Sequence, residues 1–595
     1  MLVPGILRAD SVLADFNDAK LQSKWEFYNG PEFPGGTGSF AVVERDGEKT
    51  SGVGKLTMDL SKGGEYVLAQ LNISPPIPEG TAAIKLRMKL PPGIIAILRL
   101  RDTSGQTLQY HCRRPVESFI ADHYFNAAFT LDQPTMFWGG AGSGKISGGI
   151  EHIAVGMMPM KYKDGQTDLE KYSTRLGTLL IDEIVALDQA ALTITGKEEL
   201  IRHDPGKLFG GFFPGVAIHL KNGPATLKTA ATLGLTTVRT DLFWSLIETK
   251  KGKYDFRAWD GMVKEAGGRG IRIIFMLVYG NPIHTEGDPN GDLQANHHPP
   301  RTAKSIAAFG DFAEAAAKHF AGKGITYEIW NEPNFSIFWP PKAEPQIFAE
   351  LVKETAQRIR KGDPRAQIVS GGLSGTDFAF LQKVLDTGNL DSLKAVAVHP
   401  YDKNGIEGQM DALVFFQALL KKRKTGPQEM WISELGVSSA WYGNGNDEVN
   451  RKRQASLLSR QILTLWGANI PAHILYDLFD DGTDPQNTEH HFGIYSGPAQ
   501  SKPAAEMLLH LRNATKYRQF RGMLRLEDTR VHALDFSGNG DMDRLVILWT
   551  DANEPMEVKL PASASTRSIY GQFLPQKNAT TIAVGWEPTF VYLKN

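Results

Sequence analysis

Cysteine and long apolar runs are the two features that this sequence has least of. Cys112 is the only thiol among 595 residues, so no intramolecular disulfide can form and cysteine-rich metal sites are excluded. No run of about 18 apolar residues occurs either, which is the length that a helix needs to cross a bilayer. We therefore expect no membrane insertion and no fold that depends on disulfides.

The chain also lacks an excess of charge of either sign. Its 65 Lys and Arg residues almost balance its 66 Asp and Glu residues, and the formal net charge is −1. A protein with so small a net charge does not concentrate a polyanion at its surface. We expect no nucleic-acid partner, and the sequence indicates no particular oligomeric state.

Material for hydrophobic cores is abundant. Hydrophobic residues make up 42% of the chain and charged residues 22%, which is typical of soluble globular proteins. Because single cores stop growing at about 250 to 300 residues, a chain of this length divides into several domains.

The two ends of the chain favour β-structure. Residues 1–200 contain short alternating runs such as "GSFAVVER", "AAIKLRMKL" and "LGTLLIDEIVAL", separated by Gly, Pro, Asn and Asp. Alternation with a period of two predicts strands with one buried face, and the residues between them predict turns. Runs such as "VHALDFSG" and "DRLVILWT" repeat this pattern near the C-terminus. We predict an N-terminal β-sandwich over 1–200 and a small C-terminal β-sandwich over 516–595.

Residues 205–515 change to apolar strands that alternate with amphipathic helices. This order predicts parallel βαβ units with right-handed crossovers, and continuous apolar runs are typical of strands buried on both faces. About eight such units are present, as a closed barrel requires. The fold class that we predict is α/β, a (β/α)8 TIM barrel flanked by the two sandwiches. The predicted barrel strands are "GGFFPGVAI", "TTVRTDL", "RIIFMLVYG", "ITYEIWNE", "QIVSGGL", "AVAVHPYD", "EMWISELG" and "AHILYDLFDD".

Two glutamates follow or end strands of this predicted barrel. The fourth strand ends in "YEIWNEPN", which contains Glu332, and the seventh ends in "WISELG", which contains Glu434. Reactive groups of such barrels lie at the C-terminal ends of the strands. Acetal hydrolysis needs a proton for the departing oxygen and an anion to meet the developing positive charge, and two carboxyl groups supply both. Glu332 and Glu434 are therefore our candidate catalytic residues.

These two motifs, in this order and spacing, resemble the clan of retaining (β/α)8-barrel glycoside hydrolases with catalytic glutamates on strands four and seven. The resemblance covers about 205–515 and implies that Glu332 is the acid/base and Glu434 the nucleophile. It also implies that Asn331 holds the 2-hydroxyl of the sugar. The strand-eight sequence "LYDLFDDG", followed by "FGIY" and "SKPA", is similar to glycoside hydrolase family 39, which contains β-xylosidases, α-iduronidases and exopolysaccharide hydrolases.

Three more residues match strand ends of the same clan. Arg239 in "VRTDLFW" resembles the strand-two arginine, and His399 and Tyr401 in "VHPYD" resemble the strand-six partners of the nucleophile. A cation and a phenol beside Glu434 would keep its carboxylate ionised. A structural ion pair is the alternative for Arg239, and a hydrogen-bonded histidine at the barrel rim is the alternative for His399.

Aromatic residues in or just after the strand-end loops form a second candidate group, because ring faces can stack on sugars. Packing in the core is the alternative for each ring. In many clan members a tryptophan lies under the sugar where this chain has Tyr476. The group comprises Trp244, Tyr279, Trp339, Tyr401, Trp441 and Tyr476.

We expect neither a metal nor another cofactor. The histidine pairs at 297–298 and 490–491 have neighbouring side chains that rarely reach one ion, and the acidic stretches "FDDGTD" (479–484) and "GNGDMD" (538–543) lack the full spacing of a cation loop. We interpret these stretches as turns, although His491 is a candidate for the wall of the substrate cleft.

The resemblance implies a retaining hydrolase that cleaves β-linked bonds of an oligosaccharide or polysaccharide by double displacement. A transglycosidase on the same scaffold and a noncatalytic carbohydrate-binding protein are the alternatives. The N-terminal sandwich either binds carbohydrate as an accessory domain or buttresses the barrel. The N-terminus shows no signal-peptide pattern. We still expect an extracellular or periplasmic protein whose signal peptide is missing from this sequence, with a cytoplasmic location as the alternative.

Overall fold

The computed structural model describes most of the chain and divides it into two compact units. The first unit comprises Met1–His203, Phe520–Ser568 and Phe573–Asn595, and the second comprises Asp204–Gln519 and Ile569–Gln572. The described residues are 11–17, 24–45, 48–112, 124–132, 134–160, 174–187, 192–193, 200–202, 214–220, 225–285, 298–524, 526, 530–538, 542–552, 554–561, 564–575 and 580–594.

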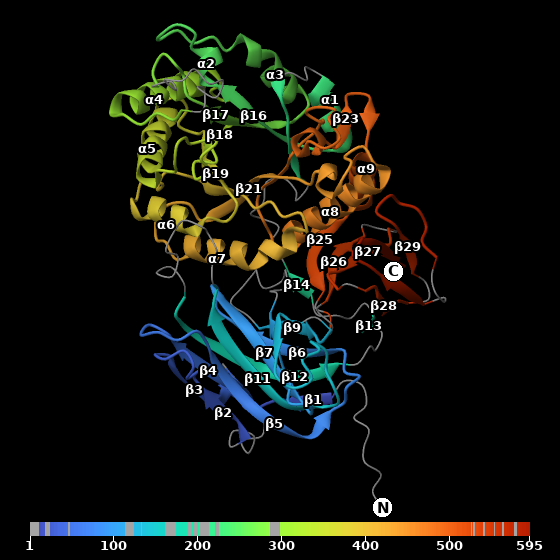
Figure 1. Cartoon of the computed structure of the whole chain (residues 1–595). Coiled ribbons are helices and arrows are strands. Elements are labelled where there is room, and N and C mark those ends of the chain that lie inside the picture. The colour runs from blue at the N-terminus through green and yellow to red at the C-terminus, as the bar shows by residue number, and fades with distance from the viewer. Residues whose placement is uncertain are drawn as a thin grey trace, which may run out of the picture. The chain divides into compact units, whose positions relative to one another are not determined.

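Two antiparallel six-stranded sheets form the N-terminal part of the first unit (Figure 1). One has the strand order β3, β4, β12, β6, β9, with β1 paired to β12, and the other has the order β10, β8, β7, β11, β5, β2. The strands are β1 (Ser11–Ala14), β2 (Glu26–Tyr28), β3 (Thr37–Arg45), β4 (Glu48–Asp59), β5 (Val67–Ile77), β6 (Ala83–Lys89), β7 (Ile94–Asp102), β8 (Thr107–His111), β9 (Phe125–Thr130), β10 (Met136–Trp138), β11 (Ile150–Pro159) and β12 (Leu176–Leu187).

Alternation along the strands explains why these sheets pack face to face. In β6, Ile84, Leu86 and Met88 are buried, whereas Lys85 and Arg87 between them are partly exposed. Buried residues from both sheets belong to one hydrophobic cluster. The period of two in the sequence therefore produces one apolar face per sheet, and the two faces form the core of a sandwich.

Two further sheets, of three and six strands, share a second core in the first unit. The strands β13 and β14 precede the barrel in the sequence, yet β13 pairs with β28 and β14 pairs with β25, which follow the barrel. The segments on either side of the barrel are thus joined by backbone hydrogen bonds. The strands are β13 (Leu192–Thr193), β14 (Leu200–Arg202), β25 (Gln519–Leu524), β26 (Val531–Ser537), β27 (Arg544–Thr550), β28 (Met556–Lys559), β29 (Ser565–Arg567), β30 (Thr581–Val584) and β31 (Thr589–Leu593).

Eight parallel strands close into a barrel in the second unit. Helices surround the outside of these strands in Figure 1. In chain order the strands are β15 (Gly215–Ala217), β16 (Thr237–Phe243), β17 (Arg272–Val278), β18 (Thr326–Asn331), β19 (Gln367–Ser374), β20 (Ala395–His399), β21 (Glu429–Leu435) and β22 (His473–Leu475). The hairpin strands β23 (Tyr495–Gly497) and β24 (Gln500–Ser501) follow.

Three helices of this unit begin at residues that favour a helix start. Thr302 forms a capping box with Ser305, Asp447 accepts hydrogen bonds from the first turn of its helix, and Pro345 occupies a first-turn position. The helices are α1 (Ala225–Leu233), α2 (Trp244–Ile247), α3 (Arg257–Gly268), α4 (Ala303–His319), α5 (Pro345–Gly362), α6 (Phe378–Asp386), α7 (Met410–Lys421), α8 (Glu448–Gly467) and α9 (Pro503–Thr515), with 3-10 turns η7 (Ile406–Gln409), η8 (Ser439–Tyr442) and η9 (Thr488–His491).

The barrel strands are buried on both faces, as their continuous apolar runs predict. Every residue of β18 and of β20 is buried, in contrast to the alternation in β6. The predicted fold class is therefore confirmed: a closed barrel accompanied by antiparallel sheets at both ends of the chain. Among the residues that the structure describes, no helix is long and apolar enough to cross a membrane.

Candidate active site

Glu332 and Glu434 meet at the C-terminal end of the barrel. Glu332 directly follows β18, the fourth barrel strand, and Glu434 is the last residue but one of β21, the seventh. One carboxylate oxygen of each glutamate and one ring nitrogen of His399 all lie within 4.8 Å of one another. The side chains of Glu332 and Glu434 are 10% and 15% exposed. The two carboxyl groups are thus close enough to act on one carbon and remain open to solvent.

Glu434 is surrounded by groups that favour its ionised form. Its Oε2 accepts a hydrogen bond of 2.6 Å from Nη1 of Arg239, and its Oε1 accepts one of 2.9 Å from the hydroxyl of Tyr401. Burial alone would raise the pKa of Glu434, but the charges of His399 and Arg239 and these hydrogen bonds outweigh burial and lower it. Burial and the facing Glu434 raise the pKa of Tyr401 well above its usual value, so the phenol remains a donor.

A third carboxylate, Glu328, lies beneath this pair and was missed by the sequence analysis. It is fully buried in β18 and accepts hydrogen bonds from Nε of Arg239 at 2.7 Å, from the hydroxyl of Ser433 at 2.7 Å and from the amide of Gly372 at 3.1 Å. Arg239 therefore bridges Glu328 and Glu434. A charged residue inside an otherwise apolar strand was the available signal, because a buried charge needs a partner.

Arg239 also orients Asn331. Its Nη2 donates to Oδ1 of Asn331 at 3.1 Å, and Asn331 is the last residue of β18. Fixing the carbonyl end of the amide in this way leaves its NH2 group in a defined direction. Three barrel strands thus contribute to one polar network through a single guanidinium group.

His399 contacts Glu332, which follows β18, and Ser433, which lies in β21. Its Nδ1 lies 2.9 Å from Oε1 of Glu332, and its Nε2 lies 3.0 Å from the hydroxyl of Ser433. The ring is fully buried, and a Cβ on Gly372 would lie 2.0 Å from its Nε2. Glycine at position 372 is therefore required for the imidazole to reach this place.

The backbone around Glu332 adopts an unusual conformation. Both Trp330 and Glu332 have positive φ angles, of 74° and 43°. Such a conformation costs roughly 1–3 kcal/mol for a residue other than glycine and persists only when its surroundings hold it. Here the amide of Glu332 donates to the carbonyl of Gly372 at 2.9 Å, and the indole of Trp330 donates to the carbonyl of Phe338 at 3.0 Å. These contacts fix the direction in which the Glu332 carboxyl points.

Four aromatic rings from the ends of strands six to eight form a connected group. Tyr401 and Trp441 make edge contacts with each other, and both contact Phe492, which also contacts Tyr476 at 5.3 Å. Tyr401, Trp441 and Tyr476 are partly exposed, whereas Phe492 is buried behind them. The three predicted rings are therefore placed side by side, and Phe492, which the sequence analysis missed, supports them.

Two predicted stacking residues lie in the core instead. Trp244 is fully buried, with one stacking contact to His284 and another to Phe312, and its indole donates to Glu248. Trp339 is fully buried against Trp330. Other side chains cover both rings, so neither ring has a face available to stack on a sugar. The prediction for these two residues is corrected.

Tyr279 lies between the core and the barrel opening. The ring is partly exposed, stacks on Phe338 at 5.8 Å and contacts Trp330 edge-on at 5.6 Å. Burial and the facing carboxylate of Asp241 raise the pKa of Tyr279 well above its usual value. It therefore remains a candidate for contact with substrate, with an un-ionised hydroxyl.

A second cluster of a histidine and carboxylates lies at the ends of strands one, two and eight. Nε2 of His219 lies 3.5 Å from Oδ2 of Asp477 and 3.4 Å from Oδ2 of Asp481, and its Nδ1 lies 3.9 Å from Oδ2 of Asp241. Burial alone would lower the pKa of His219, but the three carboxylates outweigh it and raise the pKa to about 12. Burial raises the pKa of Asp477 to about 7. We call His219, Asp477 and Asp481 the His219 cluster.

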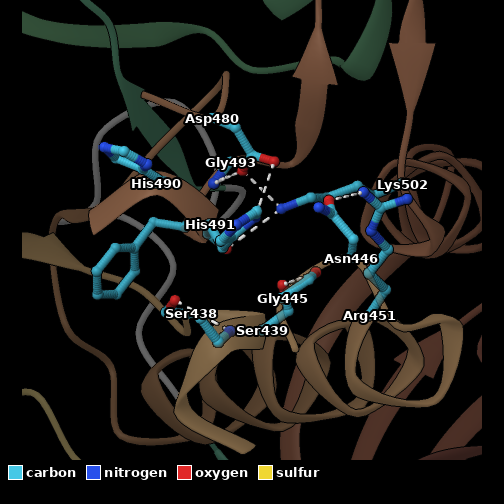
Figure 2. A network of polar contacts seen from close by, with 12 residues as sticks. Ser438, Ser439, Gly445, Asn446, Arg451, Asp480, His490, His491, Gly493 and Lys502 are labelled. Atoms are coloured by element: carbon cyan, nitrogen blue, oxygen red, sulfur yellow. Dashed lines mark hydrogen bonds and ion pairs between the residues drawn. The ribbon is translucent and has the colours of Figure 1, made fainter. Parts of the chain in front are cut away.

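The loop after β22 is held by a buried ion pair. Figure 2 shows Lys502, Asp480 and His491 pointing toward one another: Nζ of Lys502 donates to Oδ1 of Asp480 at 2.6 Å, and Nδ1 of His491 lies 3.6 Å from Oδ2 of Asp480. All three side chains are almost fully buried. His491 thus belongs to a structural network rather than to a cleft wall, and this network fixes the loop that carries Asp477 and Asp481.

A separate cavity lies at the other end of the barrel. It is lined by first residues of several strands, among them Gly215, Thr237, Thr326 and His473, and by Trp466 of α8. None of the candidate site residues lines it. The chemistry described above therefore belongs to the opposite end of the strands.

In comparisons with known proteins, the barrel resembles glycoside hydrolases. Residues 210–466 match the family model described as cellulase (glycosyl hydrolase family 5). A curated β-galactosidase from Xanthomonas manihotis is 32% identical over 191 residues. That match covers 27% of this chain and 30% of the relative, so the chain spans less than a third of the length of the curated protein that it matches.

Solved structures agree on the fold. A family 39 glycoside hydrolase from the gut symbiont Bacteroides cellulosilyticus WH2 aligns with 86% of this chain and 98% of its own, with a TM-score of 0.53 and 19% identity. A monomeric β-xylosidase from Caulobacter crescentus CB15 aligns with 68% of this chain and 99% of its own, with a TM-score of 0.50 and 15% identity. The resemblance to glycoside hydrolase barrels that the sequence indicates is confirmed.

Proposed function

We propose that this chain is a retaining hydrolase of β-linked glycosidic bonds in an oligosaccharide or polysaccharide. The premise is that residues 210–466, which match a glycoside hydrolase family model, form a glycoside hydrolase domain. The observation that carries the proposal is the pair Glu332 and Glu434, with one oxygen of each within 4.8 Å. Retaining enzymes place their carboxyl groups about 5–5.5 Å apart, whereas inverting enzymes separate them by about 6.5–9.5 Å to admit water.

The surroundings of the two carboxyl groups assign their roles. Glu434 accepts hydrogen bonds from Arg239 and Tyr401, so it is the group that stays anionic and attacks the anomeric carbon. Glu332 contacts the imidazole of His399 instead and acts as the acid that protonates the leaving oxygen. Once the glycosyl-enzyme forms, the charge of Glu434 is gone, and Glu332 can ionise and activate water as a base.

The remaining residues position the sugar. The NH2 group of Asn331, whose carbonyl end Arg239 holds, is directed to donate to a sugar hydroxyl. Tyr401, Trp441 and Tyr476 offer partly exposed rings beside Glu434. The preference for β-linkages is supported by the names of the two relatives, a β-galactosidase and a β-xylosidase.

The test of this proposal is the stereochemistry of the product. The chain is incubated with a panel of aryl β-glycosides and polysaccharides, and the first-formed anomer is identified by NMR. We expect net retention, and we expect a 2-fluoro glycoside to form an adduct that peptide mass spectrometry assigns to Glu434. Inversion, or an adduct on another residue, would contradict the assignment. Transfer to an added sugar acceptor in preference to water would identify a transglycosidase.

We also propose that the N-terminal sandwich binds carbohydrate as an accessory domain. Arg99 points away from the sandwich core and lies 4.7 Å from the ring centre of Tyr66 and 5.2 Å from that of Trp138, which is 43% exposed. Tyr66 is buried, and the exposed ring of Trp138 beside this guanidinium group suits sugar rings. Affinity electrophoresis in soluble polysaccharides should show retardation that Trp138→Ala removes; equal retardation of both proteins would refute it.

A further inference from the structure

We propose that the His219 cluster is a binding site for a divalent transition-metal ion, with Zn²⁺ as the ion whose geometry it fits. The site would use Nε2 of His219 and one carboxylate oxygen each of Asp477 and Asp481. These three atoms all lie within 4.8 Å of one another. From the sequence we expect no metal, and we interpret the acidic stretch that contains Asp481 as a turn. His219 is far from both aspartates along the chain and reaches them through closure of the barrel between β15 and β22.

The spacing within the cluster suits metal ligands and is longer than that of charge-assisted hydrogen bonds. Charge-assisted hydrogen bonds have donor–acceptor distances of about 2.7–2.9 Å. Nε2 of His219 lies 3.5 Å from Asp477 and 3.4 Å from Asp481. Ligand atoms arranged tetrahedrally around Zn²⁺, with bonds of about 2.0–2.1 Å, are separated by roughly 3.3–3.4 Å.

Unsatisfied buried atoms provide a second, independent observation. Asp477 is 1% exposed, yet neither of its carboxylate oxygens has a hydrogen-bond partner among the described residues. The Nε2 atom of His219 is buried and has no hydrogen-bond partner there either. The atoms face each other at 3.5 Å without a hydrogen bond between them. Buried polar atoms are usually hydrogen-bonded or bound to metals, and a metal ion between these atoms would satisfy all of them.

The outer contacts of the cluster support the same ligand. Nδ1 of His219 faces Oδ2 of Asp241 at 3.9 Å, while Nε2 faces Asp477 and Asp481. A carboxylate behind a ligating histidine is the usual arrangement in zinc sites. The hydroxyl of Tyr476 donates to Oδ2 of Asp481 at 3.4 Å. The buried pair Asp480–Lys502 fixes the loop that carries both aspartates (Figure 2).

The cluster can exchange an ion with solvent. The side chains of His219 and Asp481 are 26% and 19% exposed, whereas that of Asp477 is 2% exposed. Three protein ligands leave at least one coordination position for water or for a sugar hydroxyl. Because Tyr476 belongs to the aromatic group beside Glu434, a bound ion would lie next to the proposed sugar site.

The experiment measures metal binding to the full chain. The protein is dialysed against a chelator and then into buffer, and Zn²⁺ is titrated by calorimetry, with Co²⁺ absorption as a second readout of coordination geometry. We expect one ion per chain, with a tetrahedral Co²⁺ spectrum. Removing a first ligand by His219→Ala or Asp481→Asn should weaken binding by at least about 100-fold. Circular dichroism verifies that each variant is folded.

Two control variants make the outcome decisive. His319→Ala removes an exposed histidine that pairs with Asp260, and binding should be unchanged. Glu332→Gln alters the other histidine and carboxylate group, Glu332, His399 and Glu434, and binding should again persist. Absence of binding to the wild type, equal binding by His219→Ala, or loss of the ion with Glu332→Gln would each overturn the proposal.

Discussion

Two groups at the same end of the barrel have the same composition and differ in how their charges are compensated. Glu332, His399 and Glu434 form one, and the His219 cluster forms the other; in each, one histidine and two carboxylates lie within 4.8 Å of one another. The carboxylates of the first group accept hydrogen bonds from Arg239 and Tyr401 and contact His399 at 2.9 Å. In the second group, both oxygens of Asp477 have no hydrogen-bond partner among the described residues.

The difference shows that residue types alone do not determine what a cluster does. A carboxylate held by an arginine and a phenol is stabilised as an anion and can act as a nucleophile. Asp477 has no hydrogen-bond donor and has His219 at 3.5 Å as its cationic neighbour, so burial prevails, raises the pKa of Asp477 and disfavours its anion. The surroundings thus favour covalent chemistry at Glu434 and cation binding at Asp477. Variants that alter one group and leave the other intact can test this contrast.

The largest expected effect is on turnover at Glu434. Glu434→Gln keeps the size and an acceptor oxygen but removes the nucleophilic charge, so kcat on an aryl β-glycoside should fall by roughly 10⁴-fold or more. Steady-state assays measure this change. Glu265→Gln, on helix α3, is the control and should retain full activity. Turnover by Glu434→Gln close to the wild-type rate would exclude Glu434 as nucleophile.

Removal of the bridging cation should have the largest effect on folding. Arg239→Met leaves the buried carboxylates of Glu328 and Glu434 without their shared partner, so the free energy of unfolding should fall by about 3–5 kcal/mol. Urea denaturation measures it. Arg257→Met, which breaks an exposed ion pair with Asp255, should leave stability unchanged. Equal stability of both variants would show that Arg239 is not needed to compensate these charges.

A smaller effect is expected from the phenol beside the nucleophile. Tyr401→Phe removes one hydrogen bond to the Glu434 carboxylate, so kcat/KM should fall by about 10- to 100-fold. Because that bond helps to lower the pKa of Glu434, its loss raises this pKa. The acidic limb of the pH profile should therefore move to higher pH. An unchanged limb would mean that Tyr401 does not tune Glu434; Tyr517→Phe, at an exposed ring, is the control.

The smallest expected effect has the opposite sign and concerns the His219 cluster. Asp477→Asn removes a buried charge that has no hydrogen-bond donor, so in the presence of a chelator the free energy of unfolding should rise by about 1–2 kcal/mol. With Zn²⁺ present, the wild type should gain more stability than the variant. Thermal unfolding in both buffers measures this. A variant that is less stable than the wild type in chelator would show that the ion pair with His219 outweighs the cost of burying Asp477.

Much of the barrel could be predicted from the sequence because its signals are local. The amphipathic segment "AKSIAAFGDFAEAAAKHFA" corresponds to α4 (Ala303–His319), and the predicted strand "ITYEIWNE" contains β18 (Thr326–Asn331). Glu332 and Glu434 were found because strand order and the strand-end rule place them at one mouth. The domain boundaries and the catalytic roles of these residues stay predictions.

The wrong predictions and the missed residues have a common physical cause. The burial of an individual side chain is decided by neighbours that are distant in the chain. Trp244 and Trp339 follow strand ends as a stacking residue would, yet distant side chains enclose both. Glu328 lies inside an otherwise apolar strand, and its role depends on Arg239. Phe492 supports the aromatic group through ring contacts with Tyr401, Trp441 and Tyr476, which are distant from one another in the chain.

The sequence by itself determined the periodicity of each segment, and with it the barrel, the sandwiches and the positions of two glutamates at strand ends. These features follow from hydrophobic patterning and turn chemistry, which act between residues close in the chain. The compensation of charge was decided only by the tertiary structure. Closure of the barrel brings Arg239 to Glu434 and His219 to Asp477, and electrostatic interactions depend on distance in space rather than on separation in the chain.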